Sequence, residues 1–217
     1  MLFRSQSIGD IPDTIAEWRA VHELVPQDYL PYYQMGRFLS ASGKLEEAET
    51  DLRTAVAIHP SLTEGWYELG NALAAQQKYA EALTSYTVAR KQRPQDAQTV
   101  FRMGKVYELL NSPGQALQCY RNAAQLNSDD WQIYFQLGGI LDAANQPDAA
   151  LKEFAAATQL NPRYSRTHFN YGVELAKLGR LEEARHEFSE SLRLEPGYAN
   201  ARQALGKVQM LLQQSRN

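Results

Sequence analysis

Apolar residues recur along this chain at spacings that predict amphipathic helices arranged in pairs. Residues 63–96 show the pattern best. The first apolar stripe of this segment consists of Trp66, Leu69, Gly70 and Leu73. These positions stand at i, i+3, i+4 and i+7, which places them on one face of a helix. A second stripe follows at Ala82, Tyr86 and Ala89. The pattern therefore predicts two helices whose apolar faces pack against each other.

The same pattern returns at a constant interval along the chain. One glycine marks each return, at Gly36, Gly70, Gly104, Gly138, Gly172 and Gly206. An alanine follows at the same distance after each of the first five, at Ala48, Ala82, Ala116, Ala150 and Ala184. A large apolar residue comes one helical turn later, at Leu52, Tyr86, Tyr120, Phe154 and Phe188. Such a fixed period is the sequence signature of a repeat array.

These residues resemble the tetratricopeptide repeat (TPR) family, whose repeat has the same period of about 34 residues. The resemblance implies an all-α fold, a right-handed α-solenoid of antiparallel helix pairs known as the TPR superhelix. It covers five full repeats, at residues 29–62, 63–96, 97–130, 131–164 and 165–198. A partial N-terminal repeat at 1–28, consisting of a second helix, and a C-terminal capping helix and tail at 199–217 flank them.

The small residues of the repeat indicate where helices approach most closely. A bulky side chain in place of the repeated glycine or alanine would overpack the crossing, at a cost of roughly 1–3 kcal/mol. Between the two helices of a repeat, one position holds Gly43, Asn111, Asn145 and Gly179. These residue types tolerate the left-handed backbone that ends a helix. Gln77 departs from this pattern, so we expect a differently built turn there.

The ends of the chain depart from the full repeat. At the N-terminus, Gly9 takes the turn position, and Ile15, Trp18 and Val25 form the stripe of a lone second helix. We interpret this as a repeat cut in half, and expect the chain to be a segment of a longer protein. The unpaired stripe around Ile15 and Trp18 also suggests docking on another copy, which would make a homo-oligomer through the N-terminal half-repeat.

The family resemblance also implies where a partner binds. In TPR proteins the first helix of each repeat lines the concave groove, and a set of positions on that helix contacts a peptide. Here the expected groove residues are Tyr33, Arg37, Tyr67, Asn71, Phe101, Arg102, Lys105, Phe135 and Phe169. Exposed aromatics are enriched in binding hot spots, although packing of these rings against a neighbouring helix explains them equally well. The basic residues favour a carboxylate or acidic segment, unless Glu64, Glu68 and Glu108 neutralise them.

Composition narrows the function further. The net charge of −3 argues against a general nucleic-acid partner, which requires a basic surface. No apolar run is long enough for direct membrane insertion. A single cysteine, Cys119, excludes an intrachain disulfide and leaves the redox compartment open. The four histidines have no metal-ligand spacing, and His168 takes a packing position between helices.

No catalytic motif appears in the sequence, so we expect no enzyme activity, no metal and no cofactor. The leading interpretation is a scaffold that binds a protein or peptide ligand of unknown identity in its groove. One alternative is the substrate-selecting or regulatory arm of a larger enzyme, such as a glycosyltransferase. Another is a self-associating assembly module.

Overall fold

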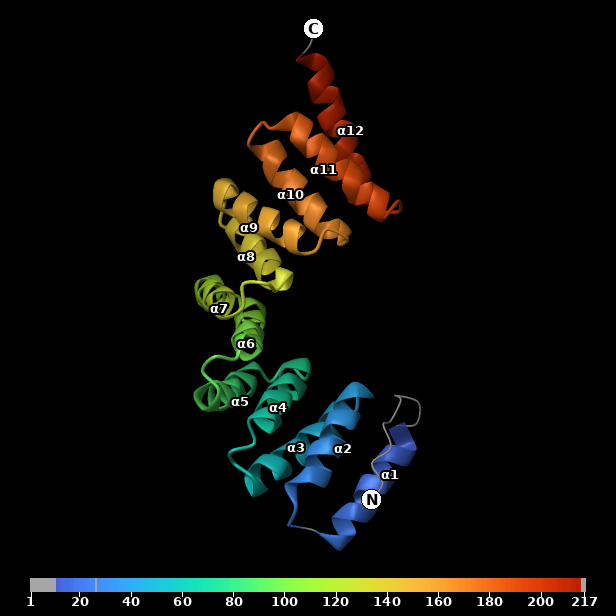
Figure 1. Ribbon diagram of the computed structural model, residues 1–217, viewed down its shortest axis with the longest axis vertical. Helices are drawn as coiled ribbons and strands as arrows, with labels where there is room; N and C mark the ends of the chain where they lie inside the picture. The colour runs from blue at the N-terminus through green and yellow to red at the C-terminus, as the bar shows by residue number, and fades with distance from the viewer. Residues whose placement is uncertain (1–10, 26, 216–217) are drawn as a thin grey trace. The chain divides into compact units, whose positions relative to one another are not determined.

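The computed structural model describes residues 11–25 and 27–215, which form twelve α-helices and no β-strand (Figure 1). The chain divides into two compact units, residues 1–112 and 113–217, and each is considered by itself. The expectation for Gly9 lies outside the described residues.

Six helices lie in the described part of each unit. Those of the first unit are α1 (Ile11–Leu24), α2 (Tyr29–Ala41), α3 (Leu45–Ile58), α4 (Thr63–Ala75), α5 (Tyr79–Gln92) and α6 (Ala97–Leu109). Those of the second are α7 (Pro113–Leu126), α8 (Trp131–Ala143), α9 (Pro147–Leu160), α10 (Ser165–Lys177), α11 (Leu181–Leu194) and α12 (Ala199–Gln214). The boundary between the two units falls between α6 and α7, which are the two helices of the third expected repeat.

The helices alternate in length with the sequence period. From α2 to α11, 13-residue first helices alternate with 14-residue second helices. Within each unit, helices adjacent in the chain pack against each other, and α2 also contacts α4, α4 contacts α6 and α10 contacts α12. The fold is therefore an all-α solenoid, as the sequence predicts.

The repeated glycines allow each first helix to approach its second helix. A Cβ added at Gly70 would lie 2.7 Å from Cδ1 of Tyr86, and one at Gly172 would lie 2.8 Å from Cε1 of Phe188. Real Cβ atoms do not come so close to another heavy atom. Both rings are about 1% exposed, so little room exists for them to move. The predicted close crossings are confirmed in both units.

The turns within the repeats share one backbone conformation. Gly43, Asn111, Asn145 and Gly179 have φ between 52° and 78°. Gln77 has φ of 62°, so the expectation of a different turn at this residue is wrong. The N–H of Lys78 donates to the carbonyl of Leu73 at 2.9 Å, which is the bond that closes a helix with a left-handed residue. Packing of α4 on α5 therefore imposes the left-handed conformation on a residue type that disfavours it.

Short polar residues and prolines start several helices. Asp130 caps α8, and its carboxylate accepts from the N–H of Gln132 at 3.0 Å. Pro113 and Pro147 are the first residues of α7 and α9. Proline suits this position because a backbone N–H in the first turn has no acceptor within the helix, so its absence costs no hydrogen bond. The turn before α8 is held by the Asn127 side chain, which accepts from the N–H of Asp129 at 3.1 Å.

The two end helices pack on their neighbours through apolar side chains, although Val25 of the expected N-terminal stripe is 45% exposed. In α1, Ile15 and Trp18 lie half-buried against Met35, Leu39 and Ala48 of the same chain, so this stripe is not an unpaired surface. In α12, Val208 is 3% exposed and joins the cluster formed by Leu175, Ala184 and Phe188; Leu205 and Leu212 pack against it.

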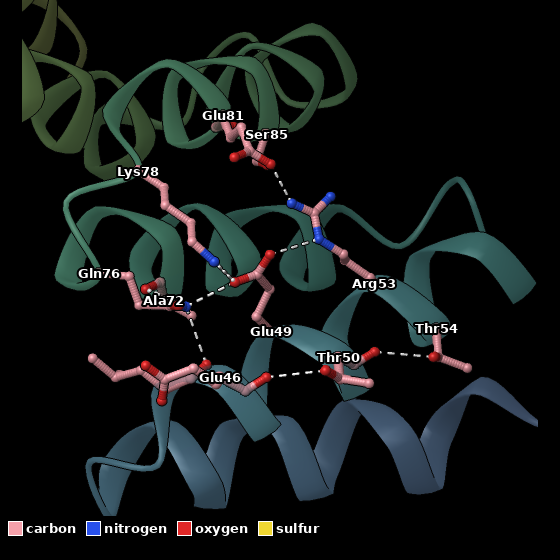
Figure 2. A network of polar contacts seen from close by, with 11 residues as sticks. Glu46, Glu49, Thr50, Arg53, Thr54, Ala72, Gln76, Lys78, Glu81 and Ser85 are labelled. Atoms are coloured by element: carbon pink, nitrogen blue, oxygen red, sulfur yellow. Dashed lines mark hydrogen bonds and ion pairs between the residues drawn. The ribbon is translucent and has the colours of Figure 1, made fainter.

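One charged network braces successive second helices in the first unit (Figure 2). The carboxylate of Glu49 in α3 accepts from Nε of Arg53 at 2.9 Å, from Nε2 of Gln76 at 2.9 Å and from Nζ of Lys78 at 2.7 Å. Arg53 also pairs with Glu81 at the start of α5. Burial would raise the pKa of Glu49, but bonds from Lys78, Arg53 and Gln76 to the ionised form lower it to about 2.

His168 is a packing residue, as the sequence indicates. It is 7% exposed, its Nδ1 lies 2.8 Å from Oε2 of Glu187, and its Nε2 lies 3.1 Å from the carbonyl oxygen of Pro162. Both partners accept hydrogen bonds, so both ring nitrogens donate when the imidazole is protonated. The bond to Glu187 is the main reason why the pKa of His168 is raised; burial opposes it, and Glu190 adds to it.

We expect the protonated imidazole to stabilise the fold below about pH 6.5 and to lose this effect as the pH rises through its raised folded pKa. His168→Gln should lower the free energy of unfolding by roughly 1.5 kcal/mol at pH 6, because a charged hydrogen bond is lost. Urea unfolding of the unmodified chain and of His168→Gln, from about pH 5 to about pH 9, measures the difference between their free energies of unfolding. A difference that is constant over this range would contradict the assignment.

Candidate protein-binding face

In the first unit, the expected groove residues lie on the three first helices. Tyr33 and Arg37 belong to α2, Tyr67 and Asn71 to α4, and Phe101, Arg102 and Lys105 to α6. Contacts of α2 with α4 and of α4 with α6 bring these helices together. We call these seven residues the first-helix face.

The aromatic side chains of this face differ in exposure. Tyr33 and Tyr67 are half-buried, and the Tyr67 ring lies 6.1 Å from the ring of Tyr86 behind it. Phe101 is only 5% exposed, so it contributes to the core and offers little surface to a partner. The packing explanation therefore accounts for Phe101, whereas each of the two tyrosines presents an outer part. Burial raises the pKa values of Tyr33 and Tyr86, so both phenols stay protonated at neutral pH.

A chain of polar contacts holds the side chains of α2 and α4. The guanidinium of Arg37 lies 5.5 Å from the centre of the Tyr33 ring, and its Nε lies 4.0 Å from Oε1 of Glu68. Nδ2 of Asn71 donates to Oε2 of Glu68 at 3.1 Å. The Tyr86 hydroxyl donates to Oδ1 of Asn71 at 2.8 Å. These bonds fix the amide of Asn71 and offset part of the charge of Arg37.

The sequence places Glu68 on this surface as a neutralising acid, but it does not identify Tyr86 as a support of the face. Tyr86 stands at the core position of the second helix, which is leucine, tyrosine or phenylalanine in the other repeats. The partner of its hydroxyl, Asn71, follows only from the approach of α5 to α4.

A second contact links α4 to α6. Nε of Arg102 donates to the hydroxyl oxygen of Tyr67 at 3.2 Å, which joins the sixth position of one first helix to the fifth of the preceding one. Arg102 is exposed, and Lys105 lies one turn further along α6. Glu64, one of the acids expected to neutralise this surface, pairs with Arg93.

The second unit contains the remaining two expected residues, and both are half-buried within aromatic clusters. The Phe135 ring lies 6.0 Å from Phe154 and 5.8 Å from Tyr164. The Phe169 ring lies 5.8 Å from Phe188 and 5.0 Å from Tyr198. The tyrosines come from the turns that end their repeats, at a position where the other repeats carry Leu62, Asp96 and Asp130, so no repeated residue type marks them in the sequence. These contacts support a packing role for Phe135 and Phe169.

One cavity of the first unit lies away from the first-helix face. The first unit has a cavity of about 440 Å³ between α1, α2 and α3, whose lining includes Ile15, Met35 and Glu47. No cluster of potential metal ligands occurs in the part of the chain that the structure describes. None of the helices within residues 11–25 and 27–215 combines the length and apolar character that a membrane crossing requires.

Comparisons with known proteins agree with this architecture. A sequence model of the tetratricopeptide repeat matches residues 33–97, 101–165 and 140–199. No curated protein sequence matches the chain. Among solved structures, YrrB, described as a TPR protein with an unusual peptide-binding site, shares 26% identity at a TM-score of 0.70. The alignment covers 86% of this chain and 96% of YrrB.

Two further structures share the fold at lower identity. A MamA fragment from Desulfovibrio magneticus RS-1 is 20% identical at a TM-score of 0.68, over 88% of this chain and 99% of that one. A chain of the APC/C hetero-tetramer Cut9-Hcn1 is 18% identical at a TM-score of 0.69, over 93% of this chain and 40% of that one. The repeat model matches most of the sequence, and the helices recur with its period. The chain belongs to the tetratricopeptide repeat family.

Proposed function

We propose that this chain is a non-catalytic scaffold whose first-helix face binds an extended peptide segment carrying a carboxylate. The observation that carries the proposal is the contact of Arg102 with Tyr67, which holds a cation and a phenol side by side on adjacent first helices. The similarity to YrrB, itself described as having a peptide-binding site, supports peptide binding as the activity.

The chemistry of the face favours an acidic ligand. Arg102 and Lys105 lie on one side of α6, and the Arg102 guanidinium is oriented by the Tyr67 hydroxyl. A guanidinium with unused N–H groups binds a carboxylate through short, charge-assisted hydrogen bonds. The outer parts of Tyr33 and Tyr67 add apolar contact area at low entropic cost. Asn71, already braced by Tyr86 and Glu68, presents its amide in a fixed orientation that suits a peptide backbone.

We expect a peptide library screened against the immobilised chain to select sequences rich in Asp or Glu, or with a free C-terminal carboxylate. Replacing Arg102 and Lys105 together by alanine should weaken the selected peptides about tenfold or more, because each charge-assisted bond contributes about 1.5–3 kcal/mol. Isothermal titration calorimetry measures the affinity.

The matched control is Lys91→Ala together with Arg90→Ala. Both residues are exposed in the last turn of the second helix α5, so this pair removes the same charge from a different surface. Affinity should change little in the control. If both double variants weaken binding equally, the interaction depends on net charge alone and this face is not the site.

A further inference from the structure

The carboxylate of Glu68 in α4 lies among the polar groups of the first-helix face. Its Oε1 lies 4.0 Å from Nε of Arg37 in α2, and its Oε2 accepts from Nδ2 of Asn71 at 3.1 Å. The Glu68 side chain is 28% exposed and that of Arg37 is 49% exposed, so both can be reached from solvent. A ligand that approaches Arg37 therefore meets an arginine that already has an acidic partner within the chain.

Two hydrogen bonds in series hold Glu68 in this position. The Tyr86 hydroxyl donates to Oδ1 of Asn71 at 2.8 Å, which leaves Nδ2 of the same amide as the donor to Glu68. Tyr86 is 1% exposed and has little room to move. Glu64, one turn earlier in α4, pairs instead with Arg93 at the end of α5. Of these two acids of α4, Glu68 is therefore the one that is directed at the basic side chain of α2.

The charge of Glu68 also acts on groups of other helices. Burial is the main reason why the pKa values of Tyr33 in α2 and Tyr86 in α5 are raised, and the Glu68 carboxylate adds to both. Burial acts to lower the pKa of Arg102 in α6, whereas the hydrogen bond to Tyr67 and the charge of Glu68 are among the causes that raise it. One carboxylate thus acts on the arginines of both α2 and α6.

We propose that Glu68 is an internal competitor for the acidic ligand: it occupies Arg37 in the free chain, and a ligand carboxylate gains Arg37 only by displacing it. This inference rests on the proposed peptide binding and identifies a residue that limits its affinity. Like charges near one arginine repel each other, and salt screens the repulsion. A ligand with one carboxylate then binds through Arg102 and Lys105, whereas a ligand with several acidic groups also displaces Glu68.

Glu68→Gln tests the proposal, because glutamine keeps the size of the side chain and an oxygen that accepts from Asn71, but removes the charge. The probe is fluorescein-labelled hexaglutamate, and fluorescence anisotropy measures its affinity. The variant should bind it about three- to tenfold more tightly than the unmodified chain, because Arg37 becomes available and the repulsion is lost.

Glu46→Gln is the matched control. Glu46 is exposed in the first turn of the second helix α3, so this variant removes the same charge from a different surface. It should change the affinity for hexaglutamate less than about twofold, because salt screens exposed charges that lie far from the ligand. If Glu46→Gln and Glu68→Gln increase the affinity equally, only the net charge matters and the competitor role of Glu68 is wrong.

The coupling between Glu68 and Arg37 provides a second test. Arg37→Gln in the unmodified chain should weaken hexaglutamate binding less than about twofold, because Glu68 occupies the guanidinium. In the Glu68→Gln background, the same change should weaken binding about three- to tenfold, because the released Arg37 then contacts the ligand. Equal effects in the two backgrounds would show that the two side chains act independently, and would overturn the proposal.

The outcomes separate this inference from the proposed function. If the Arg102 and Lys105 double variant weakens hexaglutamate binding but Glu68→Gln leaves it unchanged, peptide binding is supported and the competitor role is wrong. Weaker binding by Glu68→Gln would also overturn the competitor role, because Glu68 would then assist the ligand. If neither the unmodified chain nor Glu68→Gln binds hexaglutamate, the proposed function and this inference both fail.

Discussion

Gly138→Ala is expected to lower the free energy of unfolding by about 1–3 kcal/mol, although alanine is the better helix former. The added Cβ would lie 2.6 Å from Cε1 and 2.7 Å from Cδ1 of Phe154. Phe154 is 2% exposed and packs with Leu141 and Ala150, so the ring has no free space to enter. The helices α8 and α9 must therefore separate, or the ring must take a strained position.

The adjacent residue provides the control. An added Cβ at Gly139 meets nothing within 4 Å, and the residue lies in the same helix. Gly139→Ala should therefore raise the free energy of unfolding by about 0.5–1 kcal/mol through helix propensity alone. Urea unfolding followed by circular dichroism compares the two variants. Equal effects of the same sign would show that Gly138 is not at a close helix crossing.

Glu174→Val is expected to raise the free energy of unfolding by about 1–4 kcal/mol. Glu174 is 0% exposed, at a repeat position where the other first helices carry Phe38, Ala72, Val106 and Ile140. Its Oε1 accepts from Nζ of Lys177 at 2.8 Å, but its Oε2 has no hydrogen-bond partner among the described residues. Valine removes this desolvated charge, and Lys177 keeps its ion pair with Asp142.

The pH dependence tests the physical cause of this gain. Burial raises the pKa of Glu174, and the carboxylate of Asp142 adds to this, while the bond from Lys177 opposes it. The folded pKa is thus above the unfolded value of about 4.5, so ionisation destabilises the fold increasingly as the pH rises between the two. The gain from valine should be largest at neutral pH and shrink toward about pH 4. A gain that does not depend on pH would indicate better packing as its source.

Glu174→Gln separates charge from shape in the same experiment. Glutamine keeps the size of the side chain and removes its charge, so we expect a smaller gain than with valine. If glutamine destabilises the protein, the ion pair with Lys177 stabilises the fold by more than burial of the Glu174 carboxylate destabilises it. The interpretation of Glu174 as a destabilising residue would then be wrong.

The repeat period predicted the helices because each depends on nearby residues. A stripe at i, i+3, i+4 and i+7 defines a helix wherever it occurs, and glycine or alanine at a fixed place in it specifies a close crossing. The sequence therefore identified the crossing at Gly70 and the packing role of His168.

The polar contacts depend on the approach of segments distant in the chain, which no local pattern encodes. The turn at Gln77 shows this, since its residue type predicts against the left-handed backbone that helix packing imposes. The same holds for the first-helix face. The sequence named Arg102 and Tyr67 separately, but only the packing of α4 against α6 brings the guanidinium to the phenol. The burial of Phe101 likewise required the neighbouring helices to be in place.

The sequence by itself determined that this chain is a solenoid of tetratricopeptide repeats, because its constant period fixes helices and crossings through contacts within each repeat. Only the tertiary structure decided which side chains stay exposed and which charges pair. Exposure and pairing depend on distances between helices, and a separation of a few ångströms decides whether two polar atoms form a hydrogen bond.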